Sequence, residues 1–180
     1  MHEPWNETEV WKNKSAFFTW LRGQIRKSIW QNYPLRNEFK DEQCVPITEE
    51  IREEHGLSKQ TKKVAVCHYC SSYFPKSKLE VDHVEMAGSI RDFDEIGSFV
   101  AGITCSKTNM VLTCKPCHKV KSYAERMGIS FDLARTTKKA IDIQKGDDKL
   151  WLSDRGITPE TNAKKRRDQI IEYLSNHEGE

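Results

Sequence analysis

The chain has no long run of apolar residues, and its first residues, Met1 to Trp5, do not resemble a signal peptide. A membrane-spanning helix needs about 20 consecutive apolar residues, so we expect a cytoplasmic protein without a membrane partner. Internal repeats and low-complexity segments are also missing. Hydrophobic residues make up 37% of the 180 residues and charged residues 31%. This composition predicts one core with appended arms rather than two full cores.

A large net charge is missing too, since the formal value is only +2. Affinity for nucleic acid depends on how charges cluster rather than on their sum. Residues 12–40 are strongly basic, with Glu38 as their only acid, and residues 41–54 reverse the sign. We interpret residues 41–58 as a solvated spacer with a helical turn or two near residues 48–55. The alternative is a guard that mimics DNA over the functional site.

An amphipathic helix is predicted over residues 15–31, followed by a short helix from Pro34 towards residue 40. Its apolar stripe consists of Phe17, Phe18, Leu21, Ile25 and Ile29. Two interpretations stay open for this arm. It docks on the core with a solvated basic face, or that face lies along phosphates while Trp11, Trp20 and Trp30 pack or stack.

Cysteines are few but spaced as metal ligands. Six cysteines suit disulfides in a secreted chain, yet without an export signal metal ligation in a reducing compartment is favoured. Two C-x2-C pairs can each cover one side of a tetrahedral ion. They are Cys67 and Cys70, then Cys114 and Cys117. This pattern predicts one closed structural zinc site, and it leaves Cys44 and Cys105 as small buried thiols.

Short strands and helices surround these pairs. Alternating apolar residues predict a hairpin-like pair of strands over residues 64–66 and 79–84, and residues 108–112 lead into the second pair. Pro116 opens a helix that Gly128 ends. At the C-terminal end, the sequence predicts a last helix from Thr158 and Pro159 through about residue 175.

Four polar residues near the cysteines can cleave a phosphodiester. Asp82 and His118 offer one carboxylate and one imidazole, a sparse shell that leaves positions of Mg2+ or Mn2+ for water and phosphate. His83 is of the residue type suited to general base catalysis near neutral pH. Asn109 can hydrogen-bond near His83 and fix its orientation. Neighbouring strand residues point to opposite faces, so the Asp-His pair must lie where its strand ends.

Three further residues have an open role beside this group. Glu80 and Glu85 flank the Asp-His pair and would extend the metal shell or stay outside it. His68, inside the first cysteine pair, faces solvent or replaces a ligand.

The order Asp82-His83, Asn109, then Cys114 to His118 resembles the HNH nuclease family over roughly residues 64–128. Residues 88–90 with 92–100, and residues 17–23, add a narrower likeness to free-standing HNH endonucleases of bacteriophages. The resemblance implies an α+β fold, with a zinc-stabilised ββα-metal core between N- and C-terminal helical arms. It also implies that His83 is the base, that Asp82 and His118 bind the catalytic metal, and that Asn109 orients the base.

DNA is the partner that this interpretation predicts, in a host-cell cytoplasm if a phage encodes the chain. The predicted DNA-binding residues are Arg22, Arg26, Lys27, Lys115, Lys119, Lys121, Arg126, Lys164, Lys165, Arg166 and Arg167. Each basic cluster can instead be a solvated face, and the run at residues 164–167 covers all sides of its helix.

We expect three segments: a basic arm with an acidic linker (1–58), the nuclease core (59–128) and a C-terminal helical arm (129–180). The rival class is a zinc-stabilised module that binds DNA or protein and hydrolyses nothing. The sequence leaves four questions open. They are the recognition sequence, whether one or two strands are cut, whether the protein is a monomer or a homodimer, and whether its role is homing, packaging or restriction.

Overall fold

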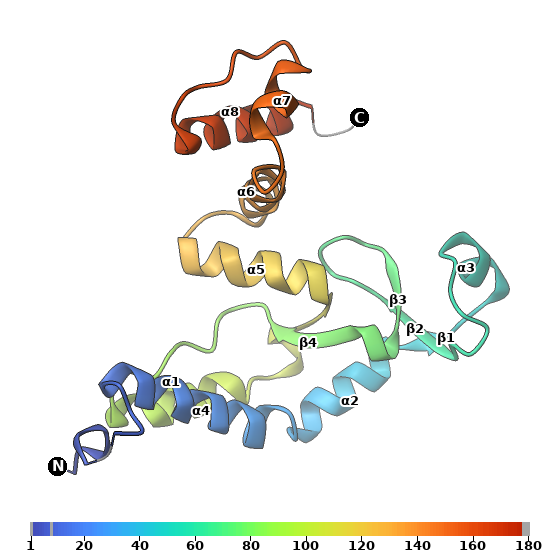
Figure 1. The fold of residues 1–180 in the computed structure, drawn as a ribbon. Coiled ribbons are helices and arrows are strands. Elements are labelled where there is room, and N and C mark those ends of the chain that lie inside the picture. Colours follow the sequence, from blue (N-terminus) through green and yellow to red (C-terminus); the bar gives the residue numbers. More distant parts are fainter. Residues whose placement is uncertain (1, 8, 178–180) are drawn as a thin grey trace. The chain divides into compact units, whose positions relative to one another are not determined.

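The computed structural model describes residues 2–7 and 9–177. Helices alternate with short antiparallel strands (Figure 1), which confirms the prediction of a mixed α and β chain. The predicted ββα-metal arrangement stays a prediction. The chain divides between Lys115 and Pro116 into two compact units. Over the described residues, every helix is too short or too polar to cross a membrane.

The N-terminal arm and the segment after the Asp-His pair share one apolar core. Helix α1 (Lys14–Ile25) runs into a π-helical turn, η2 (Arg26–Trp30), and a short turn, η4 (Phe93–Glu95), precedes α4 (Ile96–Ile103). Phe17, Phe18, Ile90, Phe99 and Ile103 are buried together, and the rest of the predicted stripe packs against them. The predicted helix over residues 15–31 is confirmed, and the arm docks on the core.

The acidic stretch holds more structure than a spacer. Helix α2 (Pro34–Gln43) extends beyond the predicted end, β1 (Val45–Pro46) pairs with a later strand, and α3 (Glu49–Glu54) confirms the predicted helical turn. The Thr48 hydroxyl accepts a hydrogen bond from the Ile51 N–H at the start of α3. Whether the stretch mimics DNA stays a hypothesis.

Two small sheets flank the first cysteine pair. One has the order β1-β2-β3, with β2 (Lys63–Val66) and β3 (Tyr73–Pro75) antiparallel, and the other pairs β4 (Leu79–His83) with β5 (Met110–Cys114). The predicted hairpin of residues 64–66 with 79–84 is therefore wrong. The turn between Cys67 and Ser72 sends the chain back along β2, so β3 takes the place next to it.

Three short helical turns complete the elements before α5. They are η1 (Pro4–Asn6), η3 (Lys76–Lys78) and η5 (Lys107–Asn109).

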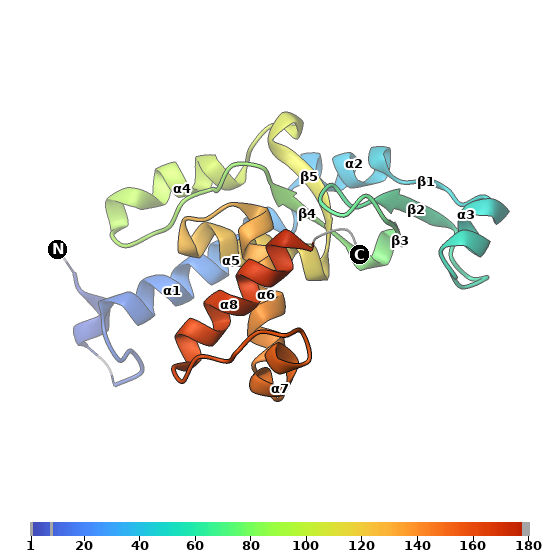
Figure 2. The same cartoon turned by 90° about the horizontal axis from the view of Figure 1, so that it is seen from above.

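The second unit is helical, with α5 (Lys115–Met127), α6 (Phe131–Ile143), α7 (Asp148–Ser153) and α8 (Ala163–Asn176). Gly128 has a φ of 64°, as a left-handed helix end requires, so the predicted stop is confirmed. Ala140, Leu152 and Ile170 form the core where α6, α7 and α8 meet (Figure 2).

The predicted start of the last helix is wrong. The side chain of Asn162 accepts hydrogen bonds from the N–H groups of Lys164 and Lys165, so Asn162 is the capping residue. Thr158 and Pro159 lie before this cap, in the connection from α7.

Candidate metal and catalytic site

The two cysteine pairs converge. The Sγ atoms of Cys67, Cys70, Cys114 and Cys117 all lie within 4.8 Å of one another. Four sulfurs at about 2.3 Å from one tetrahedral ion are roughly 3.8 Å apart, and the Sγ atoms of Cys70 and Cys114 are 4.0 Å apart. The cluster is thus compatible with a structural zinc site, as the spacing predicted. Cys44 is buried as expected, and Cys105 is half-buried.

Local backbone geometry shapes the first cysteine pair. The Ser71 N–H donates to the Cys67 carbonyl at 2.9 Å, and Ser71 takes a left-handed φ of 56°. The Cys114 N–H donates to the Cys67 Sγ at 3.3 Å. Burial raises the pKa of the Cys67 thiol, but N–H donors, with Cys114 foremost, outweigh it and lower the pKa to about 6. This environment favours the thiolate, which is the form that binds metal.

The Asp-His pair lies at the end of β4, as predicted. His83 is the last residue of the strand and is paired in register with Met110. The alternation continues to this end, since His83 is buried at 8% exposure while Asp82 is half-buried. The Asp82 Oδ1 accepts a hydrogen bond from the His83 N–H at 2.9 Å. The carboxylate is therefore tied to the backbone of the histidine.

The His83 ring is fixed by two residues that sequence reasoning did not connect to it. Its centroid lies 4.2 Å from that of Trp30 in η2, with the ring planes tilted by 33°. Its Nε2 lies 3.3 Å from the carbonyl oxygen of Ile103, at the end of α4. A carbonyl can only accept, so this hydrogen bond requires the proton on Nε2 and, in the neutral ring, leaves the lone pair on Nδ1.

Asn109 holds the backbone that follows the histidine. Its Oδ1 accepts from the Glu85 N–H at 2.8 Å, and its Nδ2 donates to the Glu85 carbonyl at 3.3 Å. The Asn109 carbonyl accepts from the Val84 N–H at 3.0 Å. Asn109 thus holds the backbone of residues 84 and 85, next to His83, and its role in orienting the base stays a prediction. That role would be indirect.

The predicted ligands of the catalytic metal fall in different units. Asp82 belongs to the first unit and His118 to the second, so their shared metal stays a prediction. Glu80 is half-buried on β4, whereas Glu85 and His68 are exposed. Exposure of His68 agrees with the solvent-facing interpretation of that residue.

The basic residues of the arm differ in their surroundings. The Arg22 Nη1 donates to the Ser89 hydroxyl at 2.9 Å, and the Arg26 guanidinium lies 5.6 Å from the ring centre of Phe99. Lys27 is exposed. The arm therefore keeps basic groups at its surface, and its contact with DNA stays a prediction.

The basic residues of α5 are also unequal. Lys115, Lys119 and Arg126 are exposed, whereas Lys121 is buried at 7% exposure and pairs with Glu125. A buried ammonium with a carboxylate partner is poorly available to phosphate. Lys121 is the weakest of the predicted phosphate contacts on this helix.

The basic run at the start of α8 has two roles. Lys164 and Lys165 are exposed, but the Arg166 Nε donates to Asp148 at 2.9 Å, with both side chains 12% exposed. Arg166 also donates to the Glu160 and Thr161 carbonyls. The Arg167 Nε donates to the Gln144 Oε1 at 2.6 Å. The two arginines thus tie α8 to its own unit.

Two features stand out among the described residues: a cluster of thiols suited to a metal, and a histidine whose ring makes two contacts at a strand end. Buried polar networks of this kind hold a side chain in one geometry. Comparisons with protein-family models, with curated proteins and with solved structures find no match to this chain.

Proposed function

We propose that the protein is a metal-dependent DNA endonuclease of the HNH type that hydrolyses phosphodiester bonds. The observation that supports it best is the fixed His83 ring at the end of β4, with Asp82 beside it and Asn109 on the following backbone. A phage-borne homing or nicking enzyme is the biological version that we favour, acting in the host cytoplasm. A packaging or restriction nuclease would use the same residues.

In this proposal His83 is the general base. The Ile103 carbonyl holds the proton on Nε2, so Nδ1 is the atom that accepts a proton from the attacking water. Trp30 packs against the ring at a tilt of 33°. Asn109 keeps the chain after His83 in one conformation through both backbone groups of Glu85. A base held in this way meets its water at a constant angle.

Asp82 and His118 are the proposed ligands of the catalytic metal. A bound Mg2+ or Mn2+ ion supplies stabilisation of the charge that develops on phosphate oxygens. The donor types fit, because a carboxylate oxygen and an imidazole nitrogen suit such ions. Asp82 is also oriented, since its Oδ1 accepts from the His83 N–H.

The four cysteines are the proposed zinc ligands, with a structural role. Four thiolates fill a tetrahedral shell and leave no position for substrate. Cys114 ends β5, the strand that pairs with β4. The zinc site would therefore stabilise the strand partner of Asp82 and His83.

Cleavage of supercoiled plasmid tests the function. With added Mg2+ or Mn2+, the protein should give nicked or linear product, and their ratio shows whether one or two strands are cut. The matched control is the same reaction without either metal. Intact plasmid with both metals, from protein that still holds zinc and binds DNA, would contradict the proposal.

A second candidate is a zinc-stabilised DNA-binding module without catalysis. One observation favours it: His83 is only 8% exposed and packs under Trp30, as a purely structural histidine would. The module would retain zinc and DNA affinity. The plasmid experiment separates the two candidates, because only the nuclease yields metal-dependent product.

Trp30 should matter to the rate rather than to DNA affinity. We expect Trp30→Ala to slow cleavage of bound DNA by up to about 10²-fold, because a small misplacement of a catalytic group can cost that much. Trp30→Phe keeps an aromatic ring over His83 and should restore most of the rate. The measurement is single-turnover cleavage beside a binding titration and a melting curve. A Trp30→Ala protein that cleaves as fast as both Trp30→Phe and the wild type would remove Trp30 as a positioning residue.

A further inference from the structure

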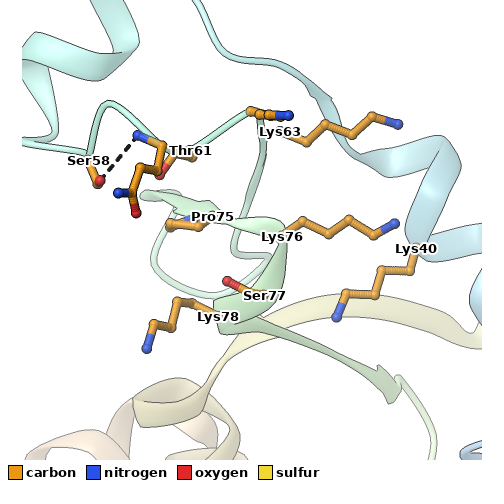
Figure 3. A pocket seen from close by; sticks show the side chains of 10 residues that line it. Lys40, Ser58, Thr61, Lys63, Pro75, Lys76, Ser77 and Lys78 are labelled. Atoms are coloured by element: carbon orange, nitrogen blue, oxygen red, sulfur yellow. Dashed lines mark hydrogen bonds between the residues drawn. The ribbon is translucent and has the colours of Figure 1, made fainter.

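A hollow lined by lysines lies on the first unit, and neither the cysteine cluster nor the Asp-His pair contributes to its lining. It has a volume of about 740 Å³ and is bordered by α2, by the chain from residue 58 into β2, and by the end of β3 with η3 (Figure 3). Its lining residues are Lys40, Ser58, Gln60, Thr61, Lys62, Lys63, Pro75, Lys76, Ser77 and Lys78. We call it the lysine pocket.

The lysine pocket carries a surplus of positive charge. Five of its ten lining residues are lysines and none is acidic. Asp41, outside the lining, pairs with Lys76. Lys62 and Lys78 are exposed, and among the described residues neither makes a side-chain hydrogen bond or an ion pair. A concentration of like charges in one hollow attracts a polyanion.

Lys40 lies among charges of both signs. Burial and the nearby positive charges of Arg36 and Lys76 lower the pKa of this ammonium, and Cys44 and the Glu80 carboxylate raise it by less. Its Nζ donates to the Leu79 carbonyl at 2.6 Å. Lys40 is thus held at the wall of the pocket beside the first residue of β4, where an anion would relieve the repulsion between the ammonium groups.

We propose that the lysine pocket binds backbone phosphates of the DNA that His83 attacks. This inference rests on the proposed function. Lysines, hydroxyls and an amide line the pocket without an aromatic ring, a composition suited to phosphate contacts that position a duplex without reading its bases.

The pocket and His83 lie at opposite ends of β4. Leu79, whose carbonyl accepts from Lys40, and His83 are the two ends of this strand, and four residues of strand span roughly 13 Å. A phosphate held in the lysine pocket would therefore be a different one from the phosphate that His83 attacks.

The test is the salt dependence of DNA binding by the full chain, without added Mg2+ or Mn2+ so that no cleavage occurs. Fluorescence anisotropy with a labelled duplex of about 20 base pairs gives the association constant at each salt concentration. A plot of log K against log salt has a negative slope, and its steepness decreases by about 0.9 for each phosphate that the protein no longer neutralises. Lys62→Ala with Lys78→Ala should make the slope less steep by about 1 to 2. The control pair, Lys139→Ala with Lys149→Ala, replaces exposed lysines outside the pocket and should leave it unchanged.

Arginine at the same two positions provides the rescue. Lys62→Arg with Lys78→Arg keeps both charges and should keep the slope, which an effect on folding alone would not explain. A slope that is unchanged in the alanine pair overturns the lysine pocket as a phosphate site. Plasmid cleavage by the same proteins separates the two proposals: wild-type cleavage with an unchanged slope rejects only the pocket, and a less steep slope without any cleavage rejects only the nuclease.

Discussion

Replacing His83 by alanine should slow DNA cleavage by about 10²- to 10⁴-fold, which is the usual contribution of a general base. DNA affinity should stay close to that of the wild type, because the ring is buried and offers little surface to phosphate. Single-turnover cleavage beside a binding titration measures both quantities. Cleavage at the wild-type rate would remove His83 from the chemistry.

Two further histidine variants sharpen this result. Since His83 is buried, alanine leaves a cavity, which is a structural cost of its own. His83→Gln fills more of the space and offers an amide that can donate to the Ile103 carbonyl, yet it supplies no imidazole base. It should be as inactive as alanine but more stable in thermal unfolding. His68→Ala, at an exposed histidine, should leave cleavage unchanged.

Replacing Cys114 by serine should unfold the first unit rather than only slow the reaction. In zinc-finger peptides, metal binding contributes about 10–16 kcal/mol to folding at pH 7. Cys114 is 2% exposed, and its N–H also donates to the Cys67 Sγ. We expect loss of bound zinc and a large fall in the melting temperature. Zinc content by mass spectrometry and circular dichroism on heating measure the two effects.

The matched control is Cys44→Ser, at a cysteine that is buried to 6% exposure but lies outside the cluster. It places a hydroxyl in a similarly buried position and should keep zinc. A folded Cys114→Ser protein with a full complement of zinc would contradict the proposed ligand set. Unfolding of both variants would point to burial rather than metal as the cause.

Local signals predicted the parts of this structure that depend on neighbouring residues. The turn residues Pro116 and Gly128 bound α5 because proline suits a first helical turn and glycine suits a left-handed end. The C-x2-C spacing placed the two thiols of each pair near one another for a similar reason, since a short turn sets the direction of both sulfurs. The stripe that begins with Phe17 follows from the helical period.

Pairings between residues far apart in the chain could not be predicted from such local patterns. The short β3 has no clear alternation, and its place beside β2 depends on the turn through Ser71. The contact of Trp30 with His83 joins residues that are far apart in the chain, so no local pattern could reveal it. Charge runs were ambiguous too, because Arg166 and Lys165 are neighbours in sequence but only Arg166 is tied to Asp148.

The π-helical turn η2 has a consequence for building chimeric nucleases. It ends at Trp30, the residue that packs against the His83 ring. A transplant that began at residue 59, where the sequence suggested that the core starts, would omit this aromatic partner. For the proposed nuclease, a transplanted segment would therefore have to begin no later than Arg26, the first residue of η2, so that Trp30 and His83 are exchanged together.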